Sequence, residues 1–332
     1  PPQRLQELLF RNSPPLFSCE WAAAHFSFHQ PHSDLAYGLE TGQVKGSHRV
    51  PGAGSRGVPW NRLCRLGQGE QGQALATALA ETLWAAGGGG RAVVCLVTAP
   101  VTTTSPEGHR ASSFTERVSM EPASASGISL KGTFGKGSHG VILFLYSLLF
   151  SRTPERLQED LGDTAPLLNV SSGNVTCTEA VLSLLLTGRA SPRALGGGRD
   201  PESGDGDGEP GGQRGPVGFL RWDPGSPPAL RTPRLPVWLC SVSGRHGVLF
   251  GTDSRLLSDW RSERIFHLYF YSGQREQTRT AHLTIDTHSH HWEEARREGP
   301  RSPGQRRPAL EMAIRTRWAG ATVSWNGTDP FF

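Results

Sequence analysis

Lysine is nearly absent from this chain of 332 residues, although its formal net charge is +4 and its isoelectric point is about 9.0. Only Lys45, Lys131 and Lys136 occur among the 34 basic residues, so arginine supplies nearly all of the positive charge. The arginines are scattered, and no basic stripe interleaved with aromatic residues is present. Because that stripe is the pattern by which proteins bind nucleic acid, we expect no nucleic-acid partner.

The sequence also lacks a run of about 18 apolar residues, so we expect no membrane-spanning segment. Its first residues, PPQRLQELLF, show neither the basic leader nor the cleavage pattern of a signal peptide. We therefore expect an intracellular protein, cytoplasmic with the nucleus as an alternative. The first residue is not methionine, which indicates a fragment with its N-terminus missing.

Paired cysteines are missing as well. The five cysteines lie far apart and form no C-x-x-C pair, which argues against a structural zinc site and against a disulfide framework. Cys95 and Cys240 stand within apolar runs and are expected to be buried. His282, His288, His290 and His291 have no carboxylate or thiol at ligand spacing, so we interpret them as part of a solvated loop. No metal ion and no other cofactor is expected.

The elements expected from hydrophobic periodicity indicate an α+β fold with helices in the first half and an antiparallel sheet in the second. Ser138 is the expected N-cap of the most apolar helix, and Pro154 opens the next one. Helices are expected over residues 74–86, 141–150, from 154 onward, and 180–186. Strands are expected over residues 19–28, 91–98, 237–240, 247–250, 265–271, 282–287, 310–318 and 321–325. We expect a single domain over residues 1–332, with disordered loops at 99–127 and 196–216.

The most informative stretch is PRLPVWLCSVSGRHGVLFG, which covers residues 233–251. Two apolar runs flank the polar link Ser243-Gly244-Arg245-His246, the pattern of a β-hairpin. This link places His246 where a buried strand begins. A histidine in that position is either a general base or an ordinary polar residue at a strand end.

Most of the chain, and above all its second half, resembles the MINDY family of ubiquitin carboxyl-terminal hydrolases, which are deubiquitinases, and in particular its fourth type. Within that type the chain is most like the inactive B paralogue. The resemblance is carried by several long motifs, in the order of the family. These are FSCEWAAAHFSFH (Phe17–His29), LSLLLTGRA (Leu182–Ala190), SGDG (Ser203–Gly206), VGFL (Val217–Leu220), TPRLPVWLCS (Thr232–Ser241), LLSDWRSERIFHLYFYSG (Leu256–Gly273), LTIDT (Leu283–Thr287) and IRTRWAGATVSWNGTDPF (Ile314–Phe331).

The resemblance implies a papain-like cysteine-protease fold and cleavage of polyubiquitin of the linkage that marks proteins for the proteasome. In this chemistry a thiolate at a helix N-terminus attacks the isopeptide carbonyl, and a histidine transfers the proton. An upstream glutamine helps to hold the oxyanion. The corresponding residues here are Gln43 for the oxyanion and His246 for the base. Counted from Cys240, Gly244 takes the place of the family histidine, and counted back from Phe250, Arg245 does. Only a local two-residue insertion with one deletion restores His246.

The nucleophile itself is absent at its expected place. The family motif continues from the glutamine as Lys-Gly-Gly-Pro-Cys-Gly and enters an apolar helix, whereas here Ser47-His48-Arg49 replace Pro-Cys-Gly. Neither Cys64 nor Ser47 has the surrounding sequence that a nucleophile needs. We therefore expect a thiol-protease family member without activity, a monomeric pseudodeubiquitinase whose partners are polyubiquitin or ubiquitinated proteins.

Two alternatives remain open at the level of sequence. The stretch from about Thr41 to Trp60 could be an intron translated in error. The real protein would then contain the catalytic cysteine motif and be an active thiol-dependent deubiquitinase. The chain could also be a scaffold that works independently of ubiquitin.

Overall fold

The computed structural model describes most of the chain, and every structural statement below concerns those residues. They are residues 2–11, 17, 19–40, 60–97, 115–120, 134, 139–162, 166–171, 174–196, 214–222, 227–274, 276–288 and 307–329. They divide into two compact units. The first unit comprises Pro1–Ser27, Gly42–Lys45 and Gly72–Ser191, and the second comprises Phe28–Thr41, Gly46–Gln71 and Pro192–Phe332.

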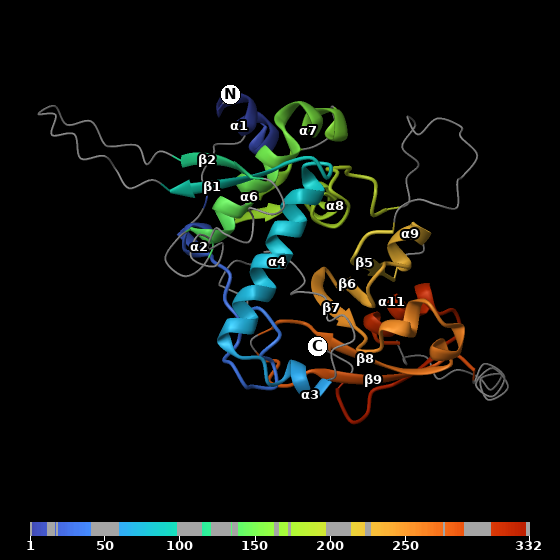
Figure 1. Cartoon of the computed structure of the whole chain (residues 1–332). Helices are drawn as coiled ribbons and strands as arrows, with labels where there is room; N and C mark the ends of the chain where they lie inside the picture. Colours follow the sequence, from blue (N-terminus) through green and yellow to red (C-terminus); the bar gives the residue numbers. More distant parts are fainter. Residues whose placement is uncertain are drawn as a thin grey trace, which may run out of the picture. The chain divides into compact units, whose positions relative to one another are not determined.

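The first unit is built mainly of helices and two short hairpins (Figure 1). Its helices are α1 (Pro2–Phe10), α2 (Cys19–Ala23), most of α4 (Gln68–Ala86), α6 (Gly140–Arg152), α7 (Pro154–Leu161) and α8 (Glu179–Thr187). Its strands are β1 (Ala92–Val97), which pairs with β2 (Thr115–Met120), and β3 (Leu168–Ser171), which pairs with β4 (Asn174–Cys177). Both pairs are antiparallel.

Two buried serines attach α6 to β1. Ser147 Oγ accepts a hydrogen bond from the Cys95 amide at 2.9 Å, and Ser151 Oγ accepts one from the Val93 amide at 2.8 Å. Because an unpaired buried amide is costly, these hydroxyls supply partners that a wholly apolar helix could not. Ser147 lies within the apolar run of residues 141–150, which the sequence marks as a helix, and Ser151 follows that run directly.

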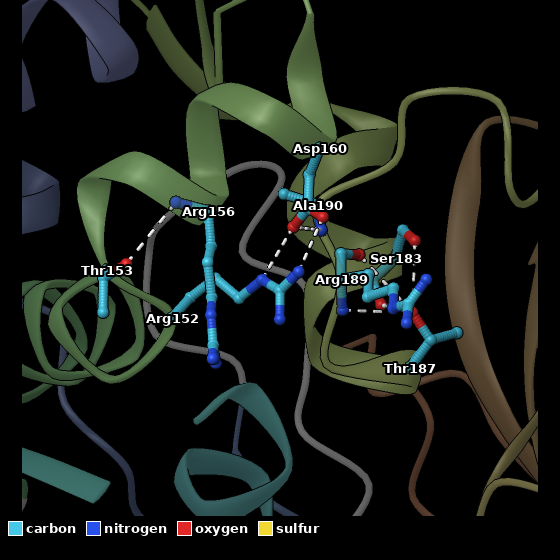
Figure 2. Close-up of polar contacts among 8 residues, drawn as sticks. All are labelled: Arg152, Thr153, Arg156, Asp160, Ser183, Thr187, Arg189 and Ala190. Atoms are coloured by element: carbon cyan, nitrogen blue, oxygen red, sulfur yellow. Dashed lines mark hydrogen bonds and ion pairs between the residues drawn. The ribbon is translucent and has the colours of Figure 1, made fainter. Parts of the chain in front are cut away.

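A buried ion pair joins α6 to α7. The Arg152 guanidinium donates two hydrogen bonds to Asp160, at 2.8 and 2.7 Å, and the Ala190 amide donates a third to the same carboxylate at 2.9 Å (Figure 2). Only 11% of the Arg152 side chain and 10% of the Asp160 side chain are exposed. Thr153 caps α7 by accepting a bond from the Arg156 amide, and Pro154 opens that helix as expected.

The second unit contains a six-stranded sheet in the order β10-β9-β8-β7-β6-β5. Its strands are β5 (Gly218–Arg221), β6 (Val237–Val242), β7 (Arg245–Phe250), β8 (Ile265–Tyr271), β9 (Ala281–Asp286) and β10 (Thr322–Ser324). All neighbours are antiparallel except β5 and β6, which are parallel. The unit also contains α3 (Trp60–Leu63), α9 (Pro228–Arg231), α11 (Ala309–Arg317) and the 3-10 turns η1 (Ser254–Leu257) and η2 (Trp260–Glu263).

The two faces of this sheet have different cores. One face packs with α11 in a large cluster that includes Trp238, Cys240, Leu249 and Ile314. The opposite face carries Phe250 and Tyr269, which pack with Leu63, Tyr37 and Trp60. We call this second side the α3 face. It comprises Phe250, Tyr269 and the residues of each strand that point to the same side of the sheet as these two, which occur at every second position.

Several sequence expectations are confirmed. Mixed helices and strands give an α+β architecture, and the helices and strands expected near residues 74–86, 91–98, 141–150, 180–186, 265–271 and 282–287 are present. Cys95 and Cys240 are fully buried. No helix among the described residues combines the length and the apolar character that a bilayer crossing requires.

Other expectations differ from the structure. Residues 310–317 lie in helix α11 rather than in the strand expected over 310–318, and residues 19–23 form helix α2 rather than the start of a strand. His139, not Ser138, is the N-cap residue of α6. Strand β2 lies within the 99–127 range expected to be a loop, because its backbone pairs with β1. The rest of that range, and most of 196–216, lie outside the described residues.

Candidate functional site

The hairpin expected from sequence is present, with a shorter link than expected. Ser243 and Gly244 alone form the turn, with φ values of 50° and 76°. Two successive residues at positive φ are the mark of a type I′ turn, which matches the twist of the flanking strands. Arg245 and His246 therefore belong to strand β7, where they pair with Val242 and Ser241.

His246 and Arg245 face opposite sides of the sheet. Because alternate residues of a strand share a face, half-buried His246 lies on the α3 face with Val248 and Phe250. Arg245 lies on the other face, exposed, and its Nη1 donates to Gln274 Oε1 at 2.7 Å. The structure thus separates the two residues that compete for the position of the family histidine.

The chain segment that precedes Gln43 is fixed to the α3 face. Tyr271, which pairs with Val248, donates its hydroxyl proton to the Leu39 carbonyl oxygen at 2.7 Å. The Tyr271 hydroxyl has only one proton. His29 Nε2 must therefore be the donor in the 2.7 Å hydrogen bond between it and the Tyr271 hydroxyl oxygen. A β-carbon at Gly38 would lie 2.8 Å from Tyr271 Cζ, so glycine is needed for this close approach.

The side chain of Gln71 braces the same segment from α4. Its amide nitrogen donates to the carbonyl oxygens of His29 and Ala36, at 3.0 and 2.6 Å. Tyr37 completes the anchor through a hydrogen bond between its hydroxyl and Thr280, and burial raises the pKa of Tyr37. These hydrogen bonds therefore anchor residues 28–40, which end three residues before Gln43.

Gln43, together with Ser47, His48 and Arg49, lies outside the described residues. The structure therefore brings one predicted site residue, His246, to the α3 face, and it leaves the predicted oxyanion residue untested.

Cys64 is the thiol nearest in sequence to the motif, and its surroundings disfavour a thiolate. Its amide bonds to the Trp60 carbonyl oxygen, so it lies at the C-terminal end of α3, where the helix dipole is negative. Its Sγ donates to the Asp34 carbonyl oxygen at 3.8 Å. Burial, and then the Asp34 carboxylate, raise the pKa of the Cys64 thiol. A reactive cysteine needs the opposite environment.

Three further thiols, Cys95, Cys177 and Cys240, are no better placed. Cys95 and Cys240 are buried, and burial raises the pKa of Cys240. Burial also raises the pKa of Cys177 to about 12. A raised pKa means that little thiolate is present at neutral pH.

A polar network in the loop between β8 and β9 was not found by sequence reasoning. Gln277 Oε1 accepts from the Ser272 amide and hydroxyl at 2.7 and 2.8 Å, and its Nε2 donates to the Phe270 carbonyl oxygen. The Ser272 hydroxyl in turn accepts from the Gln274 amide. This loop holds Gln274 beside Arg245, and only the folded register could have shown it.

The histidines expected to form a solvated loop are arranged differently from that expectation. His282 lies within β9, where its Nε2 is 3.1 Å from Nδ1 of His267 on β8. His288 contacts Arg264, while His290 and His291 lie outside the described residues. Within the described part of the chain, no group of three or more His, Cys, Asp or Glu residues could hold a metal ion.

Comparison with known proteins places the chain in the class of ubiquitin-processing hydrolases. The sequence model described as "Deubiquitinating enzyme MINDY-3/4, conserved domain" matches residues 53–327. The chain therefore belongs to the MINDY-3/4 family of deubiquitinating enzymes. This match begins after the residues that stand in the place of the nucleophile motif.

Curated relatives agree. The chain is 30% identical over 357 residues to "Probable ubiquitin carboxyl-terminal hydrolase MINDY-4" of Mus musculus, an alignment that covers 99% of this chain and 46% of the relative. The Homo sapiens protein of the same name is also 30% identical, over 99% of this chain and 45% of its own length. The chain thus spans less than half the length of these relatives. No solved structure shows significant similarity to the chain.

Proposed function

We propose that this chain is a catalytically inactive deubiquitinase, a pseudoenzyme with a papain-like fold that binds polyubiquitin or ubiquitinated proteins as a monomer. The observation that carries the proposal is the environment of Cys64. Cys64 is the thiol nearest in sequence to the place of the family nucleophile. It lies at the C-terminal end of α3, whereas the family thiol lies at a helix N-terminus, and the pKa of the Cys64 thiol is raised.

Two defects far apart in the sequence support inactivity. The first is Ser47-His48-Arg49, which stand where the resemblance places Pro-Cys-Gly. The second is in the hairpin. Arg245 and His246 are both candidates for the position of the family histidine, and they point to opposite faces of the sheet. A sequence error between Thr41 and Trp60 would explain only the first defect, so inactivity is favoured over an active enzyme with a faulty gene model.

The α3 face supports a retained binding role. Tyr271 of β8, which pairs with Val248 of β7, holds the segment up to Leu39 on this face, and this ordered scaffold supports the proposal. A scaffold of this kind can bind a ubiquitin chain without cleaving it. For the ligand we propose polyubiquitin of the proteasome-signal linkage, as in the family.

Two assays test this proposal. The purified chain is incubated with a ubiquitin carrying a C-terminal electrophile and, separately, with polyubiquitin of the proteasome-signal linkage, beside an active thiol deubiquitinase as the positive control. We expect no adduct and no cleavage. An adduct that disappears in Cys64→Ser would overturn the inactive assignment.

Binding is tested separately by enrichment of the same polyubiquitin on the immobilised chain. Enrichment without cleavage supports the pseudoenzyme, while absence of enrichment contradicts the binding role and favours a scaffold independent of ubiquitin. Sequencing the transcript across residues 38–73 addresses the remaining alternative, because an active enzyme requires a Pro-Cys-Gly there.

A further inference from the structure

His267 and His282 form a close pair on the α3 face of the sheet, outside the candidate site described above. His282 pairs with Tyr269 across β8 and β9, and His267 pairs with Thr284, so the two histidines are diagonal neighbours on the same face. His267 is exposed and His282 is partly buried. Solvent and a dissolved ion can therefore reach the point where their ring nitrogens meet.

The separation of the two nitrogens matches that of neighbouring ligands on one metal ion. Zn–N distances of about 2.0–2.1 Å and a tetrahedral angle put two imidazole nitrogens about 3.3 Å apart. The observed distance between His282 Nε2 and His267 Nδ1 is 3.1 Å, a hydrogen bond that a bound ion would replace. The Thr284 hydroxyl is 3.2 Å from the same His267 nitrogen, so a third polar atom faces this point.

The ring of His282 is held in place by its neighbours. It stacks on Tyr269 with 4.9 Å between centroids and an interplanar angle of 10°, and Tyr269 stacks on Trp60 at 4.2 Å. The orientation of this ring is thus fixed before any ion binds.

Asn326 braces the same cluster from the turn after β10. Its Nδ2 donates to Thr284 Oγ1 at 3.0 Å and to the His282 carbonyl oxygen at 3.2 Å. Its Oδ1 accepts from Ser324 Oγ at 3.2 Å, which orients the amide. Asn326 therefore holds the main chain of His282 and the Thr284 hydroxyl in place beside the two imidazole rings.

We propose that His267 Nδ1 and His282 Nε2 bind one divalent transition-metal ion, with Zn²⁺ as the representative. Both ligands are neutral imidazoles whose remaining ring nitrogens carry the protons, so binding needs a change of tautomer and no net loss of a proton. Water fills the other positions on the ion, one of them within reach of the Thr284 hydroxyl. Imidazole donors without carboxylates favour Zn²⁺, Ni²⁺ or Cu²⁺ over Mg²⁺ or Ca²⁺.

Calorimetric titration of the chain with Zn²⁺ in a chelator-free buffer tests the proposal. We expect one equivalent to bind to the unaltered chain and this binding to be lost in His267→Ala and in His282→Phe, the latter keeping an aromatic ring for Tyr269. Asn326→Ala should weaken binding less than either histidine variant, because its contacts are to the main chain of His282 and to Thr284. Mg²⁺ should give no heat of binding at the same concentrations.

Matched controls deal with the other histidines. His288→Ala and the double variant His290→Ala/His291→Ala should bind Zn²⁺ like the unaltered chain. Loss of the bound equivalent in these controls, its retention in both His267→Ala and His282→Phe, or no binding by the unaltered chain would overturn the proposal. Circular dichroism checks that each variant is folded, and His282→Gln replaces His282→Phe if the latter is not.

Discussion

At the residue scale, the Arg152–Asp160 pair gives a prediction about the stability of the first unit. Both side chains are about nine-tenths buried, and Asp160 also holds the Ala190 amide. Breaking a buried pair leaves an uncompensated charge, which typically costs about 3–5 kcal/mol. We expect Asp160→Asn to lower the free energy of unfolding by about 3 kcal/mol, measured by urea denaturation.

Glu70→Gln is the matched control for this prediction. Glu70 pairs with Arg62 at 3.5 Å, but half of its side chain and 70% of the Arg62 side chain are exposed. Because water screens such a pair, we expect a far smaller loss than in Asp160→Asn. Equal losses in the two variants would refute the role assigned to the Arg152–Asp160 pair.

Cys64 makes a second residue-scale prediction, in which the direction follows from its raised pKa. A higher pKa leaves less thiolate at neutral pH, and only the thiolate is alkylated. At pH 7.5 we expect Cys64 to react with iodoacetamide more slowly than the cysteine of an unstructured peptide, and its rate to level off at a higher pH. The rate is the difference between the unaltered chain and Cys64→Ser; a faster rate than the peptide would contradict the environment described for this thiol.

At the scale of elements, helix α11 illustrates why pattern alone was insufficient. Leu310, Met312 and Ile314 alternate as in a strand, yet the structure buries Leu310, Ala313 and Ile314, spaced as on one helix face, and leaves Met312 37% exposed. Glu311 and Arg315, four residues apart, form an ion pair at 2.8 Å along the same helix. A short segment that satisfies both periods is decided by what it packs against.

The hairpin β6–β7 was predictable because its signal is local, whereas the surroundings of the candidate site were not. Apolar runs on both sides of Ser243 and Gly244 suffice to indicate two paired strands. The contact of Tyr271 with Leu39 and the pairing of His267 with His282 join residues far apart in sequence. Such contacts depend on strand order and register, which no short-range pattern determines.

The turn of this hairpin gives an element-scale prediction with two opposite signs. Gly244 has φ 76° and an added β-carbon would meet nothing within 4 Å, so a larger residue there would suffer backbone strain alone. We expect Gly244→Val to destabilise the chain by about 1–2 kcal/mol, the cost of a left-handed conformation. Ser243→Asn should stabilise the chain by a few tenths of a kcal/mol, roughly, since asparagine tolerates positive φ better than serine.

Urea denaturation of both variants measures these changes. The matched pair is informative because a general sensitivity of the hairpin to substitution would destabilise both variants. A loss of stability in Ser243→Asn similar to that in Gly244→Val would show that the turn is not of type I′.

At the scale of the whole molecule, the family assignment and the proposed loss of activity rest on different observations. The match to the MINDY-3/4 family covers residues 53–327, which include the sheet and its hairpin. The proposed loss rests on residues 47–49, which precede that match, and on Cys64 and the beginning of β7, which lie within it. A protein can therefore keep the scaffold of a hydrolase family while lacking the groups that perform the reaction.

Restoring the nucleophile tests whether the molecule has lost more than one part. The triple variant Ser47→Pro/His48→Cys/Arg49→Gly rebuilds the Pro-Cys-Gly of the family motif. We expect it to remain inactive, because the hairpin is still altered and Pro51-Gly52-Ala53-Gly54 follow where the motif requires an apolar helix. Capture of a ubiquitin electrophile should be at least about 100-fold slower than by an active family member, since a base alone contributes 10²–10⁴-fold. Rapid capture that depends on His246, measured by comparison with a further His246→Ala variant, would mean that only the thiol was missing and would favour the faulty gene model.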